Sequence, residues 1–167
     1  MQQTIINPEK LRREIQIALL VFIICLVISG LTAFPLETEL RILVQFKTFF
    51  PEACGQWIQN IYEALVTTNN NYPYISYGTD WLAFAHLVIA VVFIGPLKDP
   101  VKNIWVIQFG MIACIMVFPL AFIAGSIREI PFYWQIIDCS FGVFGLIPLY
   151  FCYRKIIVLE KFNSTKI

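Results

Sequence analysis

The stretch Ile104–Gly125, IWVIQFGMIACIMVFPLAFIAG, decides the fold class of this chain. It contains no charged residue, although Lys102 stands just before it and Arg128 just after it. A helix needs roughly 17–25 apolar residues to cross a hydrocarbon core of about 30 Å. The stretch meets that length and therefore predicts a membrane-spanning helix.

Three more apolar runs of similar length surround this one, in a chain of 167 residues that is 59% hydrophobic. These runs are Ile15–Ala33, Trp81–Leu97 and Phe132–Tyr153. Together the four runs predict a single all-α integral membrane domain over residues 1–167, built as a four-helix transmembrane bundle. Residues 34–80, between the first and second spans, form a long outer loop.

Within the outer loop, apolar residues recur every three or four positions, as at Ile58, Ile61 and Leu65. This spacing predicts amphipathic helices that lie at the outer surface or cap the bundle. Glu37 and Glu39 are expected to face water. The polar run 69–73 is expected to break the last of these helices by turn formation.

The start of the second span offers two candidate capping residues, Thr79 and Asp80. A side-chain oxygen there would accept hydrogen bonds from the free N–H groups of the first helical turn. The small residues Ala121 and Gly125 of the third span, and Gly142 and Gly145 of the fourth, predict close contact between those spans.

Basic residues are distributed unevenly between the two sides of this topology. Nine of the 12 lie on the side of the two termini: Lys10, Arg12, Arg13, Lys98, Lys102, Arg154, Lys155, Lys161 and Lys166. Because cytoplasmic segments carry the excess of Lys and Arg, both termini are expected in the cytoplasm. The chain is thus predicted to be a multi-pass protein of the cell (inner) membrane.

Several kinds of chemistry have no support in the sequence. Its single histidine and its five cysteines, which form no CxxC pair, offer no metal or haem ligand set. It has no phosphate-binding glycine loop, no nucleophile elbow and no basic patch for nucleic acid. We therefore expect no metal, no cofactor and no nucleic-acid partner, and the lack of a catalytic motif favours a non-enzymatic role.

Two ionisable residues within the spans, His86 and Asp138, are predicted to lie at one depth. His86 is five residues inward from Trp81 and Asp138 is six inward from Phe132, which places both roughly 7–9 Å below the outer boundary. An ionisable group in a span costs on the order of 3 kcal/mol on insertion scales and tends to face the bundle interior. The pair is expected either to exchange protons or hold a polar ligand group, or to form a structural hydrogen bond between helices.

These residues are the centre of a hypothetical outward-facing pocket. Its predicted ligand-binding residues are His86, Asp138, Asp80, Gln135, Trp57 and Trp134. Asp80 has a structural alternative as a helix cap, and the tryptophans have one as anchors at the membrane interface.

The leading functional hypothesis is a membrane protein that binds a small hydrophobic or lipid-like ligand in this pocket. One alternative is a non-catalytic accessory subunit of a larger membrane complex, or an assembly with copies of itself. Another is an intramembrane enzyme that modifies a lipid or isoprenoid, with His86 and Asp138 as acid and base. Besides the lipid bilayer, the expected partners are therefore a lipid-like ligand or another membrane protein.

Three stretches carry a resemblance: Tyr77–His86 (YGTDWLAFAH), Gly95–Pro100 (GPLKDP) and Ile137–Gly142 (IDCSFG). They resemble an uncharacterised family of small four-span bacterial integral membrane proteins, which implies the same topology. The architecture is loosely similar to that of the EXPERA family of sterol isomerases and the sigma-2 receptor. That likeness implies cytoplasmic termini and acidic residues around a lipid-sized cavity.

Overall fold

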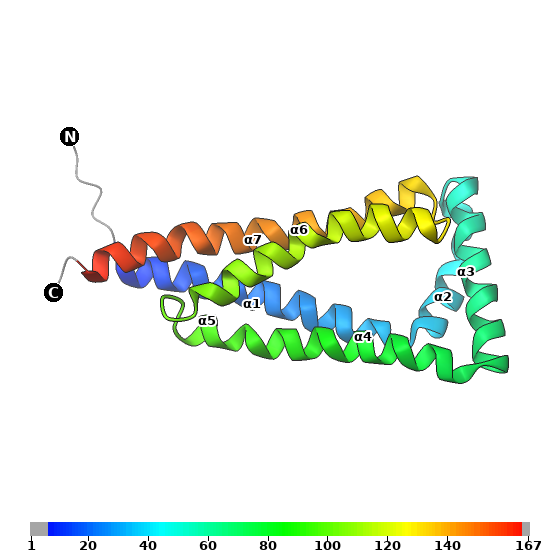
Figure 1. Ribbon diagram of the computed structural model, residues 1–167, viewed down its shortest axis with the longest axis horizontal. Coiled ribbons are helices and arrows are strands. Elements are labelled where there is room, and N and C mark those ends of the chain that lie inside the picture. The colour runs from blue at the N-terminus through cyan, green and yellow to red at the C-terminus, as the bar shows by residue number, and fades with distance from the viewer. Residues whose placement is uncertain (1–6, 165–167) are drawn as a thin grey trace. The chain divides into compact units, whose positions relative to one another are not determined.

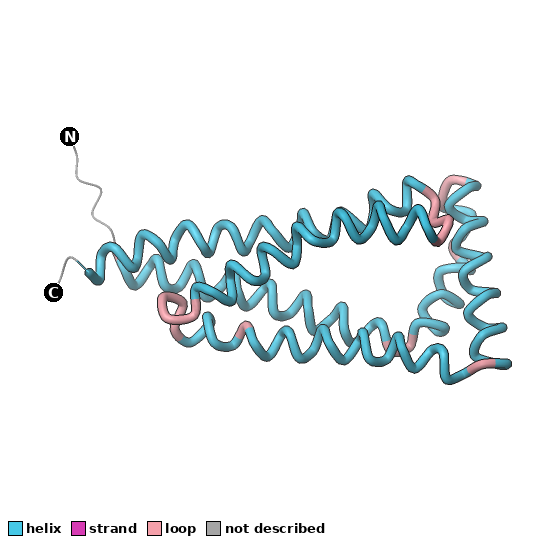
Figure 2. The backbone as a smooth tube through the Cα atoms, in the orientation of Figure 1, coloured by secondary structure: helices cyan, strands magenta, loops and turns pink. Residues whose placement is uncertain are grey.

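The computed structural model describes residues 7–164 of the chain, and these residues form helices joined by short connections, with no strand among them (Figures 1 and 2). The elements are α1 (Pro8–Ala33), α2 (Leu36–Gln45), the 3-10 turn η1 (Lys47–Phe49), α3 (Glu52–Asn71), α4 (Pro73–Val92), α5 (Ile94–Lys98), α6 (Ile104–Ile127) and α7 (Phe132–Ser164). The expected all-α class is confirmed.

Among residues 7–164, four helical segments are long and apolar enough to cross a membrane. They are Pro8–Ala33, Pro73–Lys98, Ile104–Ile127 and Phe132–Ser164. Each contains one of the four apolar runs of the sequence, so the predicted number of spans is confirmed. The chain therefore has the character of a multi-pass membrane protein.

α1 and α7, like α4 below, extend well beyond the apolar runs that predicted them. α1 begins at Pro8, and the side-chain oxygen of Asn7 accepts hydrogen bonds from the backbone N–H groups of Glu9 and Lys10, both at 3.1 Å. Asn is a favoured N-cap residue, and Pro suits the first helical position because it needs no N–H partner there. At the other end of the chain, α7 continues past Tyr153 to Ser164.

The predicted capping of the second span by Thr79 or Asp80 is wrong. α4 begins at Pro73, so Asp80 lies in its third turn, and the break after α3 is reduced to Tyr72. Hydropathy marks only the part of a helix that suits hydrocarbon, so it does not reveal the polar and aromatic turns at the start of α4. Pro73 supplies the start signal, as a proline at the first helical position.

The described chain divides into two compact units, and the boundary passes through α1 and α4. The first unit contains residues 7–24 and 91–164, and the second contains residues 25–90.

The first unit is built on the close pairing of α6 with α7, which run side by side (Figure 1). A Cβ atom at Gly142 would lie only 2.6 Å from the carbonyl oxygen of Cys114, so the backbones of the two helices approach each other closely at this point. Gly125 and Ala121 are buried as well, which confirms the predicted contact through small residues. The largest fully buried side chains include Ile15, Leu19, Phe93, Ile107, Leu149, Ile156 and Leu159.

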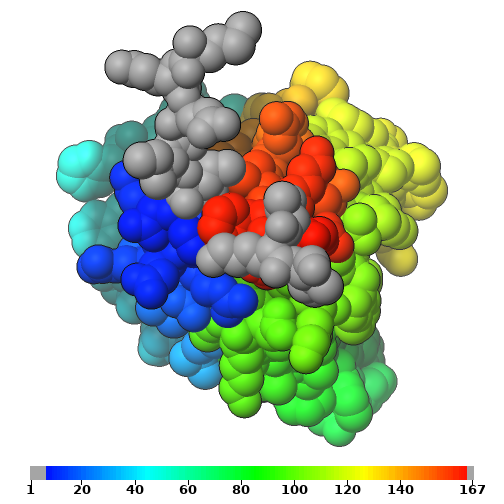
Figure 3. Space-filling model, turned by 90° about the vertical axis from the view of Figure 1, so that its left-hand side faces the viewer, coloured from blue at the N-terminus to red at the C-terminus, as the bar shows by residue number. Residues whose placement is uncertain are grey.

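Three contacts gather distant parts of the chain at one end of the first unit. The Cys152 thiol donates to the Ile15 carbonyl oxygen at 3.7 Å, and the Gln16 amide donates to the Leu97 carbonyl oxygen at 3.4 Å. Lys155 Nζ lies 2.6 Å from a Glu14 carboxylate oxygen. Figure 3 views this end, where the blue start of α1 adjoins the red end of α7. The basic segments of α1, α5 and α7 therefore share one end of this unit, and its cytoplasmic placement stays a prediction.

The second unit packs α2 and η1 against α3, and α1 against α4. Two glycines allow the close approaches. A Cβ atom at Gly55 would lie 2.9 Å from the Lys47 carbonyl oxygen, and one at Gly30 would lie 3.0 Å from the Ala83 carbonyl oxygen. α2 and α3 fall within the segment predicted to carry loop helices.

Candidate ligand-binding site

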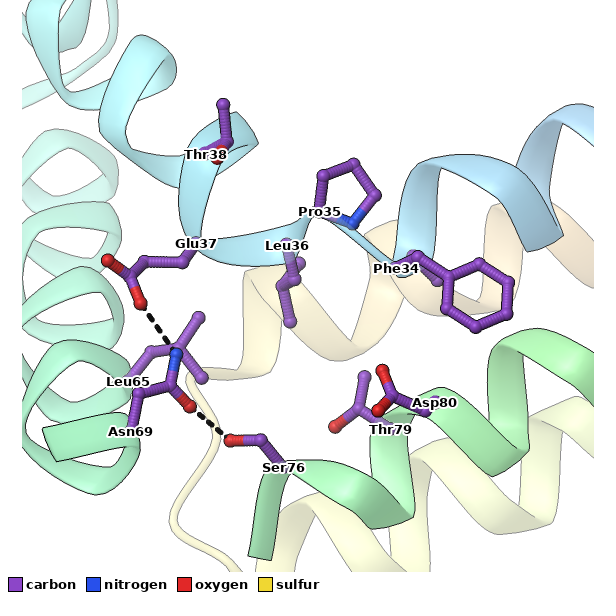
Figure 4. A pocket seen from close by; sticks show the side chains of 11 residues that line it. Phe34, Pro35, Leu36, Glu37, Thr38, Leu65, Asn69, Ser76, Thr79 and Asp80 are labelled. Carbon is purple, nitrogen blue, oxygen red and sulfur yellow. Dashed lines mark hydrogen bonds between the residues drawn. The ribbon is translucent and has the colours of Figure 1, made fainter. Parts of the chain in front are cut away.

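A pocket of about 100 Å³ lies in the second unit, where α1, α2, α3 and α4 contribute to its walls (Figure 4). The end of α1 and the start of α2 provide an apolar wall that includes Phe34, Pro35 and Leu36. The remaining walls are largely polar and carry Glu37, Thr38, Asn69, Ser76, Thr79 and Asp80.

A chain of side-chain hydrogen bonds connects three helices along one wall of the pocket. The Ser76 hydroxyl of α4 donates to the Asn69 side-chain oxygen of α3. The Asn69 amide nitrogen in turn donates to the Glu37 carboxylate of α2 at 2.6 Å. Hydrogen bonds to a charged acceptor are stronger than neutral ones. This Glu37–Asn69–Ser76 chain therefore ties α2, α3 and α4 together and occupies one carboxylate oxygen of Glu37.

Asp80 presents a second carboxylate to the pocket. Figure 4 shows it beside Thr79 on α4, away from the wall that holds Glu37 and Asn69. Within residues 25–90 the carboxylate of the half-buried Asp80 makes no hydrogen bond or ion pair. A half-buried carboxylate is stabilised when a donor or a cation meets it. Asp80 is thus a pocket carboxylate that this unit leaves available to a bound group.

A shallow apolar groove of about 310 Å³ adjoins the pocket and is lined by Phe34, Tyr77, Asp80, Trp81 and Phe84. Phe34 and Asp80 belong to both linings. The rings of Tyr77 and Trp81 meet edge to face with centroids 6.1 Å apart, and those of Trp81 and Phe84 do so at 6.0 Å. A polar pocket and an aromatic surface therefore meet at Asp80.

Of the predicted site residues, Trp57, Asp80 and His86 belong to the second unit, and only Asp80 lines the pocket. The His86 Nδ1 atom lies 2.8 Å from the Leu82 carbonyl oxygen, one turn earlier in α4. The Trp57 indole nitrogen is buried in α3, and no described residue accepts a hydrogen bond from it.

Trp134, Gln135 and Asp138 lie on α7, in the first unit. The buried Gln135 amide donates to the Ile130 carbonyl oxygen at 2.8 Å and packs against Gly125, so it closes the turn between α6 and α7. Asp138 is half-buried one turn further along. Because these three residues belong to a different unit from Asp80 and His86, the His86–Asp138 pair and the shared pocket stay predictions.

Sequence reasoning missed Glu37, Asn69 and Ser76. The expectation that Glu37 faces water is wrong, because its carboxylate is half-buried and accepts the Asn69 amide. The sequence did contain a signal for Asn69. It follows Leu65 by four residues, so it lies on the same face of α3 as the apolar residues, which indicates that it turns toward other helices. For Ser76, a small residue in a polar run, the sequence holds no comparable signal.

No protein-family model, no curated protein and no solved structure matches this chain.

Proposed function

We propose that this chain is a membrane protein that binds an amphipathic, lipid-like molecule in its second unit. The polar head occupies the pocket beside Asp80, and the apolar part lies along the groove of Phe34, Tyr77, Trp81 and Phe84. One observation carries the proposal: the polar pocket and the apolar groove share Phe34 and Asp80. A molecule that fills both must be polar at one end and apolar at the other.

The lining of the pocket favours a head group that donates hydrogen bonds or carries a positive charge. Asp80 is an acceptor without a partner in its unit, and one Glu37 oxygen is already taken by Asn69. Residues 25–90 contain five carboxylates and two basic side chains, namely Glu37, Glu39, Glu52, Glu63 and Asp80 against Arg41 and Lys47. An anionic head would meet like charge there, whereas an amine would pair with Asp80.

The groove supports the apolar half of the proposal. Tyr77, Trp81 and Phe84 expose half or more of their surface along one side of α4. Aromatic residues of this kind are enriched at the level of lipid head groups. In this proposal α2 and α3 are the amphipathic helices expected of the outer loop. They lie at the outer membrane surface, so the pocket opens at head-group depth.

The test uses the full chain in nanodiscs of zwitterionic lipid and three probes of equal chain length: hexadecylamine, hexadecanol and hexadecanoate. Binding is followed by quenching of tryptophan fluorescence. Hexadecylamine is expected to bind saturably and hexadecanoate is not. Asp80→Asn keeps the shape of the side chain and should weaken amine binding about tenfold, which is about 1.4 kcal/mol.

Glu39→Gln is the matched control, since Glu39 is an exposed carboxylate on α2 outside the pocket. It should leave amine binding unchanged. Equal binding of all three probes, or an equal loss in Glu39→Gln and Asp80→Asn, would overturn the proposal. If none of the three probes binds saturably, the proposal is overturned as well.

A further inference from the structure

The end of the first unit where α1 and α7 meet carries a surplus of positive charge. We call the exposed residues Lys10, Arg12, Arg13, Lys98 and Arg154 the basic collar. From these residues we infer that the first unit binds the phosphate groups of anionic phospholipids at this end.

Tertiary contacts bring together the three segments of the chain that carry the collar. Gln16 of α1 donates to the Leu97 carbonyl oxygen, next to Lys98. Ile15 of α1 accepts from Cys152, two residues before Arg154. These contacts bring the start of α1, the end of α5 and the second half of α7, which carry these cations, to a common end. Figure 3 shows the start of α1 and the end of α7 side by side there.

The nearby carboxylates neutralise the collar only in part: the Glu14 carboxylate, which Lys155 contacts directly, also attracts Lys10. Glu14 is occupied by Lys155 at 2.6 Å, and Asp99 pairs with Lys102 at 3.7 Å. Neither Lys155 nor Lys102 belongs to the collar. Among residues 7–164, no carboxylate forms an ion pair with a collar residue. Arg154 donates to the Tyr150 hydroxyl at 3.2 Å, a neutral partner that leaves its charge in place.

The collar lies at the ends of the membrane spans, and this position favours a lipid phosphate over a soluble anion as its ligand. Arg13 precedes the first apolar run by two residues, Lys98 directly follows the second, and Arg154 directly follows the fourth. Cations at the ends of spans extend their charged tips to the head-group level, where anionic lipids attract them. Ile156 and Leu159 are fully buried beyond Arg154, so α7 remains packed at this level and holds Arg154 in place.

The test is a thermal unfolding titration of the full chain in a non-ionic detergent, with thiol labelling of the buried Cys139 and Cys152 as the readout. Phosphatidylglycerol is expected to raise the unfolding midpoint by about 2–4 °C. Phosphatidylcholine and inorganic phosphate at the same concentration should raise it by less than half as much. The shift should shrink in high salt, since ions screen exposed charges.

The double variant Arg12→Gln/Lys98→Gln is expected to lose at least half of the shift. Arg41→Gln/Lys47→Gln removes the same charge from the exposed surface of the second unit, and this variant should retain the full shift of the unfolding midpoint. Arg12→Lys/Lys98→Arg keeps the charge and should keep the shift as well, which separates loss of binding from misfolding. An equal shift with phosphatidylcholine, an equal shift with inorganic phosphate, or equal responses of the two neutralised variants would overturn the inference.

Discussion

The two units differ in what holds them together. All of the largest fully buried side chains, from Phe93 and Leu19 to Leu149, belong to the first unit. In the second unit the buried apolar residues are Ile58, Ala83 and Ala90, and a chain of polar side chains ties α2, α3 and α4 together. The first unit is thus stabilised by close apolar packing, and the second by small-residue contacts and hydrogen bonds around a pocket.

The contrast assigns different tasks to the two units. A closely packed apolar interior resists change in shape, because adding or removing even one methylene group disturbs the packing. A pocket bordered by hydrogen-bonded side chains leaves room and polar groups for a ligand. In the proposed function, the second unit therefore holds the amphipathic ligand and the first unit supplies the rigid support.

The largest effect is expected from Leu149→Ala in the first unit. Leu149 is fully buried, so truncation removes apolar contacts and leaves a cavity, at a cost of about 2–5 kcal/mol in the free energy of unfolding. Unfolding in denaturing detergent, followed by circular dichroism, measures this loss. Leu65→Ala in the second unit is the matched comparison, and it should cost clearly less because Leu65 is half-buried at the pocket. Equal losses would remove the distinction between the units.

The next effect comes from adding one methyl group to a helical glycine. Gly142→Ala places a Cβ atom 2.6 Å from the Cys114 carbonyl oxygen, so α6 and α7 must separate. We expect a loss of about 1–3 kcal/mol, the usual cost of overpacking. A Cβ atom at Gly78 of α4 meets nothing within 4 Å. Gly78→Ala should therefore stabilise the protein by up to about 1 kcal/mol through helix propensity. The same unfolding assay measures whether Gly142→Ala lowers and Gly78→Ala raises the free energy of unfolding.

A third prediction concerns the polar links of the second unit. Asn69→Ala removes both hydrogen bonds of Asn69 and leaves Glu37 and Ser76 without these partners. The expected loss in the free energy of unfolding is about 1–2 kcal/mol. Hydrogen exchange should increase at the ends of α2 and α3 and stay unchanged along α6. Asn70→Ala, at the exposed neighbour, is the control. A uniform increase in hydrogen exchange over both units would contradict the difference between them.

The smallest expected effect is a gain at the turn between α6 and α7. Glu129 has a φ of 57°, a left-handed conformation that glycine adopts at little cost. It follows α6 at the position where helices commonly end in glycine, and the Ile130 N–H closes the turn on the Gly125 carbonyl oxygen at 2.9 Å. Glu129→Gly should raise the free energy of unfolding by about 0.5–1 kcal/mol. A loss of stability in thermal unfolding would show that the Glu129 side chain contributes more than its backbone costs.

The sequence by itself determined the class of the protein and the number of its spans. Hydropathy over about 20 residues is a local property, and a segment in hydrocarbon must satisfy its own backbone hydrogen bonds, so it forms a helix. The same local reasoning predicted close packing at Gly125 and Gly142 and singled out Asp80. It placed the start of α4 too late, because the first turns of that helix lack an apolar signal.

Only the tertiary structure decided which polar side chains meet. Asn69 and Glu37 are 32 residues apart and Lys155 and Glu14 are 141 apart, so no local pattern links them. Their contacts depend on which face of each helix turns toward a neighbour, and that choice follows from packing over the whole unit. Hydropathy and the distribution of basic residues therefore predicted the helices and the side that carries the basic collar, whereas the pocket around Asp80 arises from how those helices pack.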